Sequence, residues 1–206
     1  MVGKKLVGVA LSLLTTAVIA GCGAAQSNNS AGGHSNGAEV GSTRQDPNPP
    51  FVNRLKDLPA TPDPRFDPTS ASASIYSDIT VYAANGRKVV LDAKNTPILF
   101  VAYWCPHCQR TLVLLNKNRQ SLSQFPTLVS MGFAPGTSLA EEVRITQEEM
   151  NYFHINHVKE YYYLGSNSQK LTPQGYPTLV FPGKRGVLAM FGEHTLSAWQ
   201  QALSLR

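Results

Sequence analysis

Two cysteines separated by two residues carry the strongest chemical signal in the chain. They lie in the segment Trp104-Cys105-Pro106-His107-Cys108, after an apolar run and before a stretch with helical periodicity. A helix that begins at Pro106 would place unpaired N–H groups and a positive dipole end beside Cys105, which favours its thiolate. The same helix would return Cys108 to the side of Cys105, close enough for a disulfide. The spacing therefore predicts a reversible dithiol pair in which Cys105 attacks and Cys108 resolves a mixed disulfide.

The residues around the two cysteines are expected to tune this chemistry. Pro106 suits the first position of a helix, where its missing N–H costs nothing. His107 adds a hydrogen-bond donor, or a charge, beside the sulfur of Cys105, so we expect Pro106 and His107 to set the redox poise. Trp104 either packs into the domain or offers an apolar surface to an unfolded substrate, and we assign it to substrate binding.

The residue types alone leave open two other functions of a Cys-x-x-Cys pair. The pair could be half of a zinc site, although four ligands are needed and no second such pair exists. His154 and His157 could complete the set, which would make the protein a non-enzymatic thiol/His metal-binding or metal-delivery lipoprotein; otherwise they interact with a helix C-terminus. A structural disulfide without redox function is the remaining alternative.

The elements that would position the cysteines follow from periodicity and turn residues. Residues 98–103 form an apolar run typical of a strand buried on both faces, and a helix is expected from Pro106 to about Arg119. Asn85-Gly86 predicts a tight hairpin turn near the start of the domain. Further strands and a last helix are expected at residues 79–82, 89–91, 127–131, 161–164, 178–181, 187–191 and 195–203.

The middle of the chain is predicted to be mostly helical. Ser138-x-x-Glu141 and Thr146-x-x-Glu149 are capping-box patterns, each of which predicts the start of a short helix. Nothing else in the sequence converges on the glutamates of this segment, so they are expected on a solvated helix face. These glutamates are Glu141, Glu142, Glu148 and Glu149.

The N-terminus has the pattern of an export signal. Lys4 and Lys5 precede a 15-residue, mostly apolar stretch, residues 6–20, which is short for a membrane-spanning helix. The following Ile19-Ala20-Gly21-Cys22 resembles the bacterial lipobox, which implies that Cys22 is lipidated with more than one acyl chain and becomes the mature N-terminus. We therefore expect a protein anchored by lipid on the extracytoplasmic face of the cell membrane.

Composition divides the chain into three parts. Residues 1–21 are the expected lipoprotein signal peptide, and residues 22–74 are rich in Pro, Ser, Asn and Gly, which predicts a flexible linker. Residues 75–206 are expected to form one globular domain. The chain is 42% hydrophobic, which excludes a fully disordered protein, and its net charge of +5 is too small to suggest nucleic acid as a partner.

A family resemblance adds to these inferences. The WCPHC segment after an apolar strand, with Gly175-Tyr176-Pro177-Thr178 about 70 residues later, resembles the thioredoxin-like thiol-disulfide oxidoreductases. The resemblance covers most of residues 75–206 and implies a thioredoxin-like α/β fold, with a central mixed sheet flanked by helices, a hairpin at the N-terminal edge and a helical insertion in the middle. It also implies that Pro177 is cis and faces the cysteines, and that Tyr176 binds the substrate strand.

The resemblance leaves the direction of electron flow open. Cys-Pro-His-Cys is similar to the motif of the periplasmic oxidase DsbA, whereas membrane-tethered relatives are often reductants. The family implies exported protein thiols or disulfides as substrates, a membrane redox partner that recycles the pair, and no metal or organic cofactor. One departure stands out: the position six residues before Cys105, which usually holds a buried acid, is Leu99. A proton acceptor for Cys108 is then missing or comes from elsewhere in the fold.

Overall fold

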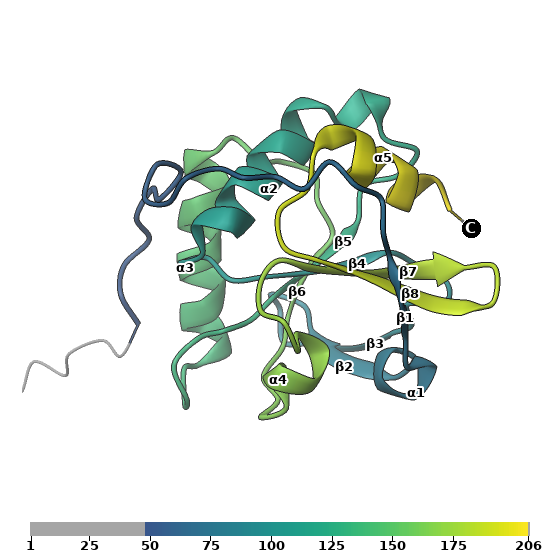
Figure 1. Ribbon diagram of the computed structural model, residues 1–206. Coiled ribbons are helices and arrows are strands. Elements are labelled where there is room, and N and C mark those ends of the chain that lie inside the picture. Colours follow the sequence, from purple (N-terminus) through teal and green to yellow (C-terminus); the bar gives the residue numbers. More distant parts are fainter. Residues whose placement is uncertain (1–47, 206) are drawn as a thin grey trace, which may run out of the picture. The chain divides into compact units, whose positions relative to one another are not determined.

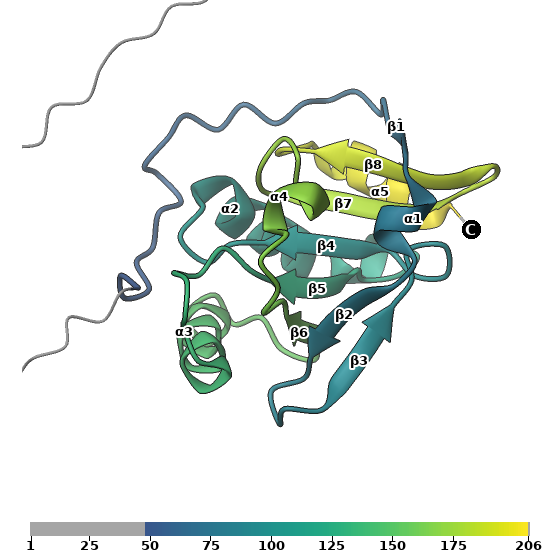
Figure 2. The same ribbon diagram turned by 90° about the horizontal axis from the view of Figure 1, so that it is seen from below.

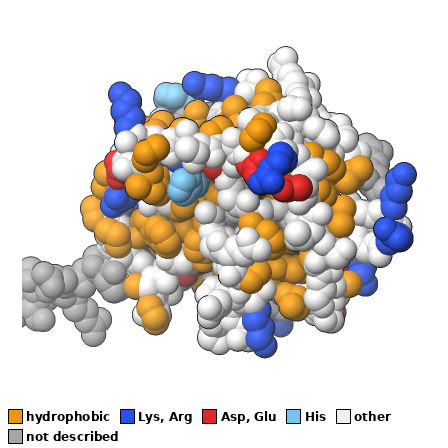
Figure 3. Space-filling view, in the orientation of Figure 1, with side chains coloured by type: hydrophobic (Ala, Val, Ile, Leu, Met, Phe, Trp, Pro, Cys, Tyr) orange, Lys and Arg blue, Asp and Glu red, His pale blue; other side chains and the backbone are white. Residues whose placement is uncertain are grey.

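The computed structural model describes residues 48–205, which belong to one compact unit. The predicted signal peptide, residues 1–21, and the predicted lipidation site, Cys22, lie outside the described residues. Within the described part, no helix is both long and apolar enough to cross a membrane. On the face drawn in Figure 3, basic and acidic side chains are spread among apolar ones.

Eight strands form a single sheet. They are β1 (Thr69–Ala71), β2 (Ile79–Tyr82), β3 (Lys88–Leu91), β4 (Ile98–Val101), β5 (Thr127–Ser130), β6 (Glu160–Tyr162), β7 (Thr178–Gly183) and β8 (Gly186–Phe191). Their order across the sheet is β1-β8-β7-β4-β5-β6-β2-β3. β4 runs parallel to β5 and antiparallel to β7, so the sheet is mixed, and the β2–β3 hairpin forms one edge.

Helices cover both faces of this sheet. They are α1 (Ala73–Tyr76), α2 (Pro106–Lys117), α3 (Leu139–Tyr152), α4 (Ser168–Leu171) and α5 (Leu196–Ser204), with a short 3-10 turn at Arg119–Ser121. Figure 1 shows α2 and α5 on one side of the sheet and α1 and α4 on the other. The predicted α/β class is confirmed: a central mixed sheet is flanked by helices, a hairpin forms one edge, and the helix α3 lies between β5 and β6 in the middle of the chain.

Strand β4 anchors the segment that carries the cysteines. Its side chains alternate between two cores: Leu99 and Val101 pack with α2 and α5, whereas Ile98 and Phe100 pack with α1 and the β2–β3 side. All four residues are buried. A strand with apolar contacts on both faces is held firmly in place, so the turn that follows it is fixed relative to the sheet.

Trp199 is the largest fully buried side chain in the core beneath α5. Its indole N–H donates a hydrogen bond to the carbonyl of His194 at 3.0 Å. We expect Trp199→Ala to lower the free energy of unfolding by about 3–5 kcal/mol, because it leaves a large cavity and an unpaired buried carbonyl. Denaturant unfolding of the chain measures this, with Trp104→Ala at a 40% exposed position as the control. A loss for Trp199→Ala no larger than that of the control would contradict the prediction.

The middle segment contains one long helix rather than two short ones. Ser138 caps α3 as predicted, because its hydroxyl accepts a hydrogen bond from the backbone N–H of Glu141 at 3.3 Å. The second predicted start, at Thr146, is wrong. The Thr146 hydroxyl donates back to the carbonyl of Glu142, one turn earlier, so the residue lies inside a continuous helix instead of capping a new one.

The described part of the predicted linker lies against the domain. We call residues 48–68 the N-terminal strap; Figure 2 shows it running along the domain to β1. Strand β1 pairs with β8, so the sheet begins six residues before the predicted domain start at Ile75. Asp63 forms a backbone bridge with His194, and Phe66 packs near Phe181, with ring centroids 6.5 Å apart. Composition does not reveal these contacts, because most of them are made by backbone groups.

Candidate active site

Cys105 lies at the junction between β4 and α2. It is the N-cap of α2, and Pro106 occupies the first helical turn. The Cys105 N–H donates to the carbonyl of Ala102 at 3.0 Å, and the Cys105 carbonyl accepts from the N–H of Gln109 at 3.0 Å. The strand, turn and helix predicted from the sequence are therefore present, with the sulfur of Cys105 at the helix N-terminus, where thiolates are favoured.

The Cys105 thiol lies in an environment that stabilises its negative charge. The hydrogen bond from the Cys108 thiol is the largest influence and lowers the pKa of Cys105 to about 6. Burial opposes this shift, while the backbone N–H groups of Cys108 and His107 and the charge of His107 reinforce it. The Cys105 thiol lies 3.7 Å from the carbonyl oxygen of Tyr176. Cys105 is therefore largely thiolate at neutral pH.

This pKa predicts how fast Cys105 reacts at different pH values. The rate of alkylation by iodoacetamide should rise about tenfold per pH unit below pH 6 and level off above it, since only the thiolate attacks. Mass spectrometry of the reduced protein after timed quenching measures this rate. Cys108→Ala should move the inflection upward, because it removes the main hydrogen-bond donor to the thiolate. An inflection at pH 8 or above in the unaltered protein would contradict the prediction.

Cys108 has the opposite environment. It is fully buried, and its sulfur accepts a hydrogen bond from the backbone N–H of Ala102 at 3.4 Å. Burial is the main reason that the pKa of Cys108 lies well above its usual value, and the neighbouring charges of Cys105 and Glu149 add to the increase. The two thiols are thus differentiated: Cys105 is ionised and 5% exposed, whereas Cys108 is protonated and fully enclosed.

A buried acid near the cysteines comes from α3 and not from β4. Leu99 is part of the apolar core. Glu149 is 1% exposed, and its Oε1 atom has no hydrogen-bond partner in the described structure. Burial is the main cause of its raised pKa, and the charges of Glu160 and Cys105 contribute. Glu149 therefore supplies a carboxyl group that interacts electrostatically with both cysteines.

The predicted solvated face of α3 is wrong for two of its glutamates. Glu141 and Glu148 do lie outward, where both pair with Arg144. Glu142 and Glu149 are buried, on the same inward side as Thr146. Together with buried Ile145 and Met150, these three residues follow the spacing i, i+3, i+4, i+7 and i+8 of an inward helix face, and this signal could have revealed their burial from sequence.

His107 is held by an ion pair that the sequence did not reveal. The guanidinium of Arg110 donates to the carboxylate of Glu193 at 2.7–3.0 Å, and His107 Nδ1 lies 3.0 Å from the same carboxylate. Burial alone would raise the pKa of Glu193, but the hydrogen bonds from Arg110 and His107 outweigh it and lower that pKa. Glu193 is 83 residues from Arg110, so no local pattern indicates the contact.

Three further predicted residues surround Cys105. Trp104 is exposed, and its indole N–H donates to the carbonyl of Gly132 at 2.8 Å. Its ring meets Tyr176 edge-on, with centroids 5.9 Å apart. The Tyr176–Pro177 bond is cis, and the Tyr176 carbonyl oxygen can accept a hydrogen bond from Cys105 only when that thiol is protonated. An aromatic surface and the backbone before the cis proline thus lie side by side next to the Cys105 sulfur.

The two histidines considered as metal ligands lie elsewhere. His154 and His157 are exposed, follow the end of α3 and have positive φ values of 54° and 55°. The hollow they line also involves Asn116 and Arg119 but neither cysteine. Within residues 48–205, no group of three or more His, Cys, Asp or Glu side chains is arranged to hold a metal ion.

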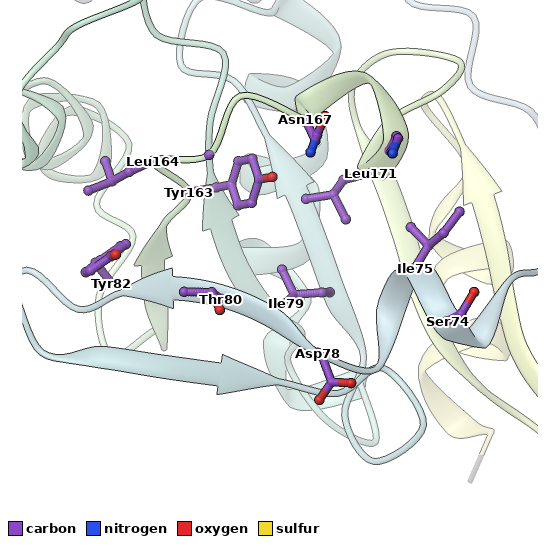
Figure 4. A pocket seen from close by; sticks show the side chains of 12 residues that line it. Ser74, Ile75, Asp78, Ile79, Thr80, Tyr82, Tyr163, Leu164, Asn167 and Leu171 are labelled. Carbon is purple, nitrogen blue, oxygen red and sulfur yellow. The ribbon is translucent and has the colours of Figure 1, made fainter.

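Another hollow of about 440 Å³ lies on the sheet face away from α2. Figure 4 shows it between β2 and the segment around α4, with Ile79 and Leu171 pointing into it. Its lining residues include neither Cys105 nor Cys108. It is therefore separate from the two cysteines.

Comparisons with known proteins find that this chain is similar to solved structures. No protein-family model matches the chain, and no curated protein matches it significantly. The exposed lipoprotein thioredoxin of Streptococcus pneumoniae is 19% identical, with 62% of this chain and 98% of that chain covered and a TM-score of 0.43. A thio-disulfide isomerase from Thermus thermophilus is 16% identical, with 70% and 95% covered and a TM-score of 0.42. A secreted disulfide oxidoreductase of Mycobacterium tuberculosis is 17% identical, with 50% and 75% covered and a TM-score of 0.35. At these identities and scores, the function of this chain has to be inferred from its own site.

Proposed function

We propose that this protein is an extracytoplasmic thiol-disulfide oxidoreductase that exchanges disulfides with exported proteins through Cys105 and Cys108. The observation that carries the proposal is the asymmetry of the pair: the pKa of Cys105 is lowered to about 6 at a helix N-terminus, whereas burial raises that of Cys108. A nucleophile and a protected resolving thiol are what the exchange reaction requires.

The exchange proceeds in two steps for a substrate disulfide. The Cys105 thiolate attacks one substrate sulfur, an S–S bond forms between them, and the other substrate sulfur leaves as a thiolate. Cys108 then loses its proton and attacks Cys105, which releases the second substrate thiolate and leaves a Cys105–Cys108 disulfide. Two electrons pass to the substrate, and the reverse sequence oxidises a substrate dithiol. No metal or organic cofactor enters either step.

The neighbouring residues have supporting roles in this proposal. Trp104 and Tyr176 offer aromatic surface to the polypeptide around the substrate cysteine, and the backbone before Pro177 pairs with it. Pro106 starts α2 and His107 adds its charge and backbone N–H, so both adjust the redox potential. Lipidation of Cys22 would hold the domain at the membrane, beside a membrane redox partner that recycles the pair.

The reduction potential of the Cys105/Cys108 pair tests the proposal and sets its direction. Equilibration in glutathione buffers, followed by thiol trapping and mass spectrometry, gives this value. A potential near about −120 mV would make the protein an oxidase, and one near about −270 mV would make it a reductase. In either case the protein should catalyse exchange with a reduced or scrambled protein substrate. A pair that stays oxidised at potentials well below −300 mV, with no catalysed exchange, would overturn the proposal.

A further inference from the structure

A groove of about 440 Å³ adjoins the candidate active site. We call it the Glu142 groove; the turn at residues 131–137 and the loop at residues 163–166 form its walls, and Glu142 lines it. It begins at Gly132, whose carbonyl accepts the hydrogen bond from Trp104, the residue before Cys105. A polypeptide held against Trp104 would therefore have its neighbouring residues at the mouth of this groove.

The mouth of the groove is shaped by a glycine. Gly132 has φ +81°, and a Cβ atom there would come within 3.2 Å of both the Ala102 Cβ and the Tyr176 hydroxyl. A side chain at this position would be strained and would crowd Tyr176. The glycine thus allows Tyr176 to lie directly against the backbone at the edge of the groove.

Glu142 is a buried acid without a complete set of partners. It is 4% exposed, and its Oε2 atom has no hydrogen-bond partner in the described structure. Burial raises the pKa of Glu142 to about 8. A carboxyl group buried in this way costs stability unless a donor or cation satisfies it. No lysine, arginine or histidine is among the residues that line the groove.

The other groups near Glu142 do not supply a positive charge. Tyr162 on β6 interacts electrostatically with Glu142, and its hydroxyl contacts Thr146 and Glu160. Tyr163 lines the groove from the loop after β6. Glu149 lies about two turns further along α3. None of these groups is basic, so nothing among them neutralises the ionised form of Glu142, and a cation that enters the groove would stabilise that form.

We propose that the Glu142 groove binds a lysine or arginine side chain of the protein substrate, close in sequence to the substrate cysteine. This inference rests on the proposed function, because the occupant is part of the exchanging polypeptide. Met131, Phe133 and Leu164 line the groove and can pack against the aliphatic part of such a side chain, while its charged end meets Glu142. The groove thus selects among exported proteins by the charge beside their cysteines.

Peptides with one cysteine, presented as mixed disulfides with glutathione, test this inference. Three matched sets carry lysine, norleucine or glutamate at one to four positions on either side of the cysteine. For the best position, the second-order rate constant at which the peptide oxidises the reduced protein in a single turnover should favour lysine over norleucine by about tenfold, the effect expected of a hydrogen bond to a charged group. The ratio should rise between pH 6 and pH 8 as Glu142 ionises, whereas the ionisation of Cys105 cancels in the ratio.

Glu142→Gln should reduce the lysine-to-norleucine ratio to near 1. Glu141→Gln, one residue away on the outer side of α3, should retain it. Circular dichroism and the unfolding midpoint establish whether each variant is folded. If Glu142→Gln is not folded, the lysine-to-norleucine ratio of the unaltered protein and the pH dependence of that ratio test the inference by themselves. Equal rates for lysine, norleucine and glutamate peptides in the unaltered protein would overturn the inference while leaving the proposed function intact. Turnover of no peptide and no protein substrate would instead overturn the proposed function.

Discussion

Replacing Cys105 with serine is expected to reduce catalysed disulfide exchange to the uncatalysed rate. A serine hydroxyl is not ionised near pH 7, so the variant lacks the nucleophile that the lowered pKa of Cys105 provides. The remaining thiol, Cys108, is fully buried and protonated, so it cannot take over the attack. Reduction of insulin disulfides, followed by turbidity, measures the loss.

Cys108→Ser provides the matched control for this result. It retains the nucleophile but lacks the resolving thiol, so mixed disulfides with substrate should accumulate and be visible on a non-reducing gel. Full activity of Cys105→Ser, or no trapped species with Cys108→Ser, would rule out the assigned roles.

Glu149→Gln is expected to raise stability at pH 8 and to leave it nearly unchanged at pH 4. The folded-state pKa of Glu149 lies above the unfolded value, so the folded protein retains a proton that the unfolded chain releases above about pH 4.5. Stability is thus lost as the pH rises from the unfolded pKa through the folded one, by up to about 1.4 kcal/mol per pH unit. Urea unfolding of the reduced protein at several pH values measures the difference between variant and parent.

Glu148→Gln is the control for this experiment, because Glu148 is on the same helix but exposed and paired with Arg144. It should show no such pH-dependent gain. Glu149→Gln should also lower the pKa of Cys108, since the charge of Glu149 is one reason that this pKa is high. The mixed disulfide would then resolve at lower pH. If the difference in unfolding free energy between Glu149→Gln and the parent protein is the same at pH 4 and pH 8, Glu149 is not a buried group that titrates in this range.

The local structure of the candidate site could be predicted from sequence because it depends on neighbouring residues. Cys105, Pro106 and Cys108 lie within one turn between a strand and a helix, and the apolar run of β4 and the proline identify that junction. The β2–β3 hairpin could be predicted from sequence in the same way, because Asn85-Gly86 determines its turn. In each case the information lies within a few residues of the feature.

The acid–base environment of the cysteines could not be predicted in the same way. Glu149 reaches the dithiol from a helix more than 40 residues later, and Glu193 reaches His107 from the loop after β8. A glutamate in a helix is more often solvated than buried, so its burial is decided by how α3 packs on the sheet. Such contacts depend on tertiary structure, which residue types alone do not determine.

Strand β1 protects the sheet from pairing with other molecules. It is only three residues long, but it covers the outer edge of β8 at Val187, Leu188 and Ala189. A shortened chain that starts at Ile75 would lose β1 and expose these backbone groups on an apolar strand, which is a template for intermolecular strand addition. We expect such a chain to form dimers or aggregates by edge pairing, whereas a chain that includes the N-terminal strap and β1 would not pair through this edge.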